Sequence, residues 1–192
     1  SLFADLWPIR KPRWHQVHGI DCAEVTEFGQ ECGRVDGLFT RMSGAPVAVV
    51  TADCVPILLA RRGPGPTSAA ASGGAVAAVH AGWRGTRSRI LRALWSRLEA
   101  QGERARNWVV AVGPAIGPCC YEVSEELATD FAREFAWAGS KFAVPRHRTL
   151  DLSAINASEL RSLGFGEVEV LRCCTMCSKK VALPEFHSFR RE

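Results

Sequence analysis

Short apolar runs, either alternating with polar residues or rich in β-branched side chains, predict strands along much of the chain. In "WHQVHGI" the alternation ends at a glycine, which is typical of a strand end. In "PVAVVTADCVPILLA", Thr51, Asp53 and Pro56 interrupt the apolar run and so predict two short buried strands around a break. The predicted strands lie in 14–20, twice in 46–60, and in 75–80, 108–114 and 167–171.

Apolar residues spaced three and four apart predict helices between these strands. After Thr86 one apolar face carries Ile90, Leu91, Leu94, Trp95 and Leu98. In a second helix Leu127, Phe131 and Phe135 point inward, and in a third Ser153 is the expected cap and Gly164 the stop. The predicted helices span 86–100, 124–138 and 153–164.

Strands and helices mix without strict alternation, which predicts an α/β, or α+β-like, layered domain with mixed β-sheets flanked by helices. A chain of 192 residues, 47% of them hydrophobic, is long enough to bury one core, so we expect residues 1–192 to form a single domain. The stretch "RRGPGPTSAAASGG" (61–74) has no core-forming residues. We interpret it as a flexible surface hairpin within the domain.

Composition narrows the classes of partner. The 24 basic and 20 acidic side chains give a net charge of +4, which suits small anions but not nucleic acid. No apolar stretch has the ~18–20 residues that a membrane helix needs, and the first residues lack the apolar block of a signal peptide. We therefore expect a cytoplasmic protein, either a monomer or a homodimer, without membrane partners.

Eight cysteines occur in a chain with ample core residues, so reduced thiols are expected instead of a disulfide framework. Adjacent cysteines would point to opposite faces of an extended segment, so at most some of Cys119, Cys120, Cys173 and Cys174 can share a site. Cys174 and Cys177 have the C-x-x-C spacing of half a structural zinc site or a redox pair. No second C-x-x-C follows, which favours a simpler role.

Three residues where apolar segments end or break are candidate metal ligands. His18 directly precedes Gly19, and His80 lies two residues before Gly82, each at the end of a predicted strand. Cys54 follows an acidic residue where an apolar run is interrupted. Zinc accepts two imidazoles and one thiolate and keeps a fourth position for water or substrate when it is catalytic. The separations of 36 and 26 residues are too long for a zinc finger and indicate a site assembled by the fold. The simpler alternative is two hydrogen-bonded histidines and a core cysteine.

Arg84 lies in the turn that precedes the predicted helix 86–100. Unpaired N–H groups at a helix start favour a bound anion, and a guanidinium strengthens this preference. The alternative is that Arg84 pairs with Asp53 or covers the Trp83 ring.

The motifs "HQVHG", "VDGLFT", "TADCVPILL", "AAVHAGWRGT", "VGPAIGPCCYEV" and "LDL", followed by "CCT" and "SFRR", resemble the YfiH/laccase-domain family in this order. Its members are named polyphenol oxidases or purine nucleoside phosphorylases. The resemblance implies a layered α/β fold, similar to that of the cytotoxic necrotizing factor toxins, and a metal held by His18, Cys54 and His80. It also implies zinc-dependent phosphorolysis of purine nucleosides such as adenosine, inosine and guanosine, joined in some members by adenosine deamination.

The resemblance gives each candidate residue an expected role. Cys54, His80, Arg84 and Asp53 are the expected catalytic residues, and Arg84 and Gln16 are expected to bind substrate. Phosphate would bind at Arg84. Asp53 would orient a ligand imidazole, act as a general base, or simply cap a turn. Family members begin with several tens of residues before the "QVHG" motif, whereas this sequence has seventeen before His18, so we expect either a reduced N-terminal part or a longer protein of which this sequence is a piece.

Other functions remain open at this stage. A copper-dependent, laccase-like polyphenol oxidase is one alternative, although five scattered histidines are few for several copper ions. A hydrolase that edits peptidoglycan precursors is another. A metal-stabilised binding module is the alternative that is not an enzyme.

Overall fold

The structure is a computed structural model that describes residues 2–63, 74–180, 183–184 and 186–191. The main part of the predicted surface hairpin, 64–73, lies outside the described residues. Within the described ranges no helix has the length and apolar character needed to cross a bilayer.

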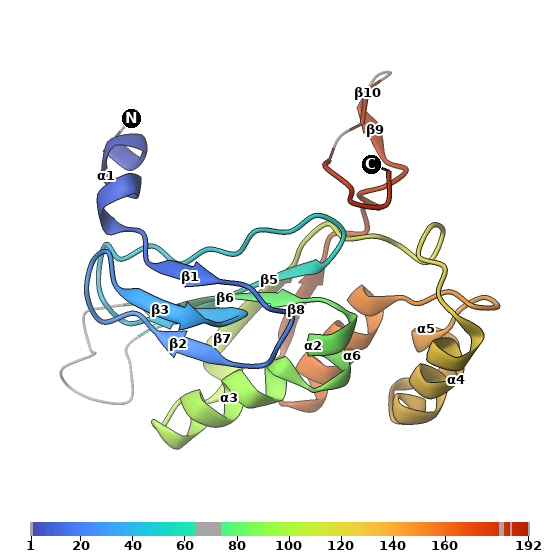
Figure 1. Ribbon diagram of the computed structural model, residues 1–192. Coiled ribbons are helices and arrows are strands. Elements are labelled where there is room, and N and C mark those ends of the chain that lie inside the picture. The colour runs from blue at the N-terminus through green and yellow to red at the C-terminus, as the bar shows by residue number, and fades with distance from the viewer. Residues whose placement is uncertain (1, 64–73, 181–182, 185, 192) are drawn as a thin grey trace.

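A mixed sheet of six strands forms the centre of the protein (Figure 1). Its two outer pairs, β2 with β4 and β7 with β8, are parallel, and the three inner pairings are antiparallel. This confirms the predicted mixed α/β architecture. The order across the sheet is β2 (Cys22–Glu24), β4 (Gly37–Thr40), β6 (Val76–Ala81), β5 (Val55–Arg61), β7 (Trp108–Val112) and β8 (Glu167–Val170).

Helices cover one face of the sheet, shown below it in Figure 1. The apolar residues predicted for the first long helix, from Ile90 to Leu98, are all buried there, as is Phe131 of the next helix. The helical elements are α2 (Trp83–Arg87), α3 (Ile90–Ala100), η2 (Ala105–Asn107), α4 (Glu125–Glu134), η3 (Ala136–Ala138), α5 (Ser140–Ala143) and α6 (Leu152–Ser162). Short 3-10 helices connect α3 to β7 and α4 to α5.

A second, smaller core lies on the opposite face. Successive side chains of a strand point to opposite faces, and in β4 Phe39 joins the main core while Leu38 joins the smaller cluster with Val25, Val35 and Ala45. The remaining elements are α1 (Leu2–Arg10), the parallel pair β1 (Arg13–His15) and β3 (Glu31–Arg34), and the antiparallel pair β9 (Lys179–Lys180) and β10 (Leu183–Pro184).

One predicted strand is shorter than expected, and another does not form. The strand predicted for 14–20 ends at His15, because the next backbone N–H groups are bonded to a side chain and not to a neighbouring strand. The first strand predicted within 46–60 does not form. There the Gln16 side chain accepts from Val50 N at 2.8 Å and donates to Val50 O at 2.7 Å, so a side-chain amide takes the place of a strand partner.

The predicted helix boundaries also shift. The helix predicted for 86–100 is two helices, because Arg89 between them adopts a left-handed conformation with φ 65°. The Arg89 guanidinium lies 4.2 Å from the centre of the Phe135 ring, so the residue that separates the two helices also contacts the chain after α4. The cap of α6 is Asp151 instead of Ser153, since its carboxylate accepts from Ala154 N at 2.8 Å.

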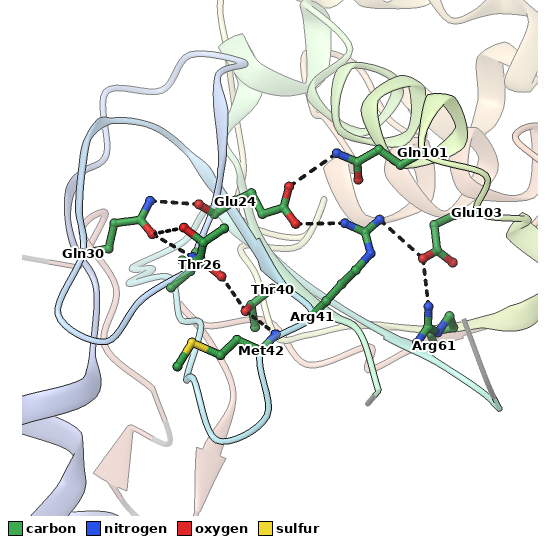
Figure 2. Close-up of polar contacts among 10 residues, drawn as sticks. Glu24, Thr26, Gln30, Thr40, Arg41, Met42, Arg61, Gln101 and Glu103 are labelled. Atoms are coloured by element: carbon green, nitrogen blue, oxygen red, sulfur yellow. Dashed lines mark hydrogen bonds and ion pairs between the residues drawn. The ribbon is translucent and has the colours of Figure 1, made fainter. Parts of the chain in front are cut away.

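A buried ion-pair network connects the first strands to the middle of the sheet (Figure 2). Glu103 accepts from Arg61 at 3.0 Å, from Arg41 at 3.4 Å and from the Trp108 indole N–H at 3.0 Å. Arg41 also donates to Glu24 at 2.9 Å. These contacts join β2, the chain after β4 and the end of β5 to the loop after α3, and removing one partner of such a pair would leave an uncompensated buried charge.

Candidate metal centre and active-site cleft

A cleft of about 450 Å³ opens where the ends of β5 and β6 meet the loop after β1. This volume is in the range of small-molecule sites. Apolar and aromatic side chains form much of its wall, and a few charged groups converge on it. The lining residues are Gln16, His18, Val50, Ala52, Asp53, Cys54, His80, Trp83, Arg84, Ile116, Tyr121, Leu152, Phe189 and Arg190.

The structure brings together His18, Cys54 and His80, the three residues predicted as ligands. One potential ligand atom from each lies within 4.8 Å of the others. Cys54 directly precedes β5, and β5 pairs with β6 so that Pro56 is opposite His80. His18 reaches the same point from a loop in which its own φ is 59°, and its ring packs edge-on against His80 with centroids 4.8 Å apart.

Asp36 holds this arrangement, and sequence reasoning missed it. Its fully buried carboxylate accepts backbone N–H groups of Val17, His18 and Gly19 at 3.1, 2.9 and 2.7 Å. It also lies 2.7 Å from His80 Nδ1. One carboxylate thus fixes the loop that carries the first histidine and the ring of the second. The residue lies in the "VDGLFT" motif, but nothing in its spacing indicates the contact.

The ionisation of these groups suits a cation. Burial raises the pKa of Asp36, but the hydrogen bonds from His80 and from the backbone of Gly19, Val17 and His18 outweigh burial and lower it. Burial lowers the pKa of His80 despite the nearby carboxylate, so the ring is neutral at neutral pH. The hydrogen bond to Asp36 assigns the proton to Nδ1 and leaves the Nε2 lone pair available as a ligand.

The thiol of Cys54 is the third candidate ligand. Burial, together with the negative charges of Asp53 and Asp36, raises the pKa of its thiol to about 11. A divalent cation reverses this balance, because it binds the thiolate and compensates both carboxylates. Gly82 leaves the necessary room, since a Cβ there would lie 2.9 Å from His18 Cδ2 and 3.0 Å from Cys54 Sγ. The donor set and the cradle therefore fit zinc.

Asp53 lies in the cleft wall, but the carboxylate that contacts the His80 ring is Asp36, and the expected catalytic role of Asp53 stays a prediction. The Asp53 carboxylate accepts from Thr175 Oγ1 at 2.6 Å and from Arg190 N at 2.9 Å. Asp53 has φ 85°, a strained conformation for a residue with a Cβ, which these two bonds support. Asp53 thus joins the C-terminal segment to the chain directly before Cys54.

Arg84 also lies in the cleft, although the helix that carries it, α2, is only five residues long. Its guanidinium carbon lies 4.4 Å from the centre of the Trp83 ring. Arg84 therefore covers the Trp83 ring, one of the alternatives expected from the sequence. Such stacking leaves the N–H donors at the guanidinium rim free to face a ligand.

Gln16 lines the cleft beside His18, but its amide is already engaged. It bonds Val50 through both its oxygen and its nitrogen, and it accepts from the Trp14 indole at 3.2 Å. Its expected role in binding substrate stays a prediction.

Two further cleft residues come from motifs whose chemistry was not assigned from the sequence: Tyr121 in "CCYEV" and Arg190 in "SFRR". Arg190 lies 5.3 Å from the centre of the Tyr121 ring. Burial and the charge of Cys54 raise the pKa of Tyr121 to about 12, against the opposing effect of Arg190 and Arg84. The phenol is therefore a neutral donor near two cations.

The chain is similar to proteins of one known family. Residues 4–192 match the family model described as multi-copper polyphenol oxidoreductase laccase. A protein from Xylella fastidiosa named purine nucleoside phosphorylase is 31% identical over 94% of this chain and 67% of its own length. Purine nucleoside phosphorylase YfiH of Escherichia coli is 32% identical over 95% of this chain and 69% of its own.

Among solved structures, YlmD from Geobacillus stearothermophilus superposes with a TM-score of 0.71 at 32% identity, over 93% of this chain and 68% of that one. The chain thus spans about two thirds of the length of these relatives. It belongs to the multi-copper polyphenol oxidoreductase laccase family, the family of YfiH and YlmD.

Proposed function

We propose that the protein is a metal-dependent purine nucleoside phosphorylase, with zinc held by His18, Cys54 and His80. The main support for the proposal is that these three side chains line the same cleft as the guanidinium groups of Arg84 and Arg190. Relatives at 31–32% identity are named for the same reaction. In it, phosphate displaces a purine base from the anomeric carbon of a nucleoside.

The guanidiniums of Arg84 and Arg190 would bind phosphate. Arginine donates two parallel hydrogen bonds to a phosphate, which fixes its orientation as well as its position. The neutral Tyr121 phenol beside them can donate a third bond, because its raised pKa keeps the proton on oxygen. These three groups would hold the nucleophile against the sugar and so reduce the entropic part of the barrier.

The base would bind on the aromatic part of the wall, near Phe189, whose side chain is 75% exposed at the rim of the cleft. Stacking of a flat base on an aromatic ring removes this apolar surface from water. Zinc, when bound, supplies a Lewis acid that can polarise a substrate or a water molecule. We propose adenosine deamination as a second activity of the same cleft.

The test is phosphate-dependent release of base from inosine, adenosine and guanosine, with ribose 1-phosphate measured as the second product. In Arg190→Gln the KM for phosphate should rise roughly 10- to 100-fold, since hydrogen bonds to a charged group contribute about 1.5–3 kcal/mol. Arg106→Gln, at an exposed arginine outside the cleft, is the matched control and should behave as wild type. Base release that does not depend on phosphate would contradict the proposal.

The family description makes copper-dependent phenol oxidation the second candidate. The five histidines of the chain are few for a cluster of several copper ions, which favours the first candidate. Metal analysis of protein purified without added copper separates the two. Stoichiometric copper with phenol oxidation and no phosphorolysis would favour oxidation, whereas turnover of a peptidoglycan precursor alone would favour the editing hydrolase.

A further inference from the structure

Four cysteines outside the His18–Cys54–His80 group meet where two loops run side by side. The first loop carries Cys119 and Cys120 after β7, and the second carries Cys174 and Cys177 after β8. A parallel bridge between Ala115 and Cys174 joins the loops. In this bridge the amide of Thr175 donates to Ala115 O at 3.1 Å.

Both loops turn sharply at the cysteines, which corrects an expectation from the sequence. Neighbouring cysteines point apart only in an extended chain. Here Cys120 N and Tyr121 N both donate to Gly117 O at 2.9 Å, so Cys119 and Cys120 lie within a tight turn and both reach the cluster. A second turn is closed by Ser178 N donating to Cys174 O at 2.9 Å, and it brings the two sulfurs of the C-x-x-C motif together.

The sulfur positions fit a tetrahedral ion. All four Sγ atoms lie within 4.8 Å of one another, and those of Cys119 and Cys177 are 3.6 Å apart. Four sulfurs at about 2.3 Å from a zinc ion are about 3.8 Å from each other. A disulfide requires about 2.05 Å instead. The 3.6 Å separation and the 4.8 Å upper limit are compatible with four ligands around one ion and exclude a disulfide between Cys119 and Cys177.

The surroundings of the cluster match those of a thiolate site. The amide of Gly117 donates to Cys174 Sγ at 3.3 Å, and bonds of this kind stabilise a metal-bound thiolate. Gly117 also leaves room beside the sulfurs, because a Cβ there would lie 3.3 Å from Cys119 Sγ and 3.7 Å from Cys174 Sγ. Cys174 is buried and Cys120 half-buried, whereas Cys119 and Cys177 are exposed, so an ion can enter from the surface.

We propose that Cys119, Cys120, Cys174 and Cys177 form a second metal site, a closed four-thiolate zinc centre that fixes the two loops to each other. The adjacent pair replaces the second C-x-x-C that a sequence search for such a site requires. Tetrahedral coordination by four sulfurs is characteristic of structural zinc.

The site would act on the cleft through the segments that it joins. Ile116 and Tyr121, on the first loop, line the cleft. On the second loop Thr175, directly after Cys174, donates to Asp53, directly before Cys54. The ion therefore positions one wall of the cleft without contacting substrate.

The test is the zinc content of protein purified without chelators. Wild type should hold two zinc ions per chain, and Cys177→Ser and Cys54→Ala should each hold one. Cys177 is exposed, so serine there changes packing little. Cys173→Ser is the matched control, because Cys173 is adjacent to a proposed ligand but outside the cluster, and it should hold two.

Cobalt provides a readout that does not depend on how Cys177→Ser folds. In Cys54→Ala loaded with cobalt, the remaining ion should show the intense visible absorption of tetrahedral thiolate coordination. One zinc ion per chain in wild type, all of it lost in Cys54→Ala, would overturn the proposal. A disulfide within the cluster in protein purified under reducing conditions, or stoichiometric iron there, would overturn it as well.

Discussion

The two sulfur-containing clusters differ in what surrounds them. The group of His18, Cys54 and His80 faces a cleft and offers three ligands, and Asp36 holds the His80 ring and the backbone N–H of His18. The four-cysteine cluster offers four thiols from two turns and lies outside the residues that line the cleft. Three ligands beside a cavity are the pattern of a catalytic ion, and four without one are that of a structural ion. Both sites would hold the same metal, so the number of protein ligands and the access to a cavity would distinguish the catalytic ion from the structural one.

The largest effect is expected from Cys54→Ala, which removes a ligand at the cleft. Turnover should fall more than the roughly 100-fold that loss of a group supporting a ligand can cost. The fold should persist, because the core and the four-cysteine cluster are unchanged. Phosphorolysis assays and circular dichroism measure the two outcomes. If this variant unfolds while Cys177→Ser remains folded, the roles of the two clusters are reversed.

Asp36→Asn should have the next effect, because it weakens the support of both histidines without removing a ligand. Zinc affinity and activity should fall roughly 10- to 100-fold, the range found when a hydrogen-bond partner of a ligand is lost. Excess zinc should restore activity here but not in Cys54→Ala. The control is Asp21→Asn, at an exposed carboxylate nearby in the sequence. Equal loss in both variants would contradict a positioning role.

The smallest effects are expected from the two glycines that border the clusters. In Gly82→Ala the added Cβ would lie 3.0 Å from Cys54 Sγ, and roughly tenfold weaker zinc binding should follow from overpacking. In Gly117→Ala the nearest sulfur is 3.3 Å away, so the four-cysteine cluster should lose less. Competition with a chelator measures both. A larger loss in Gly117→Ala would show that the closed site is the more sensitive to crowding.

Much of the fold could be predicted because hydrophobic spacing is a local property. The buried face of α3 follows directly from the residues between Ile90 and Leu98, and α4 begins after Ser124, the first residue of the predicted helix, whose side chain accepts from Leu127 N at 3.2 Å. The errors lie where side chains replace backbone partners. Gln16 bonds Val50 in place of a strand, and Asp151 replaces Ser153 as a cap. Hydrophobic period and propensity carry no information about which polar side chain bonds a given backbone group, whether it is three residues away or thirty-four.

By itself the sequence determined the class of fold and nominated His18, Cys54 and His80, since each marks the end or break of an apolar segment. Only the tertiary structure decided which carboxylate supports them, because Asp36 reaches His80 across 44 positions of the chain. Tertiary structure also brought Cys119 and Cys120 to Cys174 and Cys177. The physical reason is the same in both cases. Pairing of β4 with β6, and of the loop after β7 with the loop after β8, sets distances that no local pattern encodes.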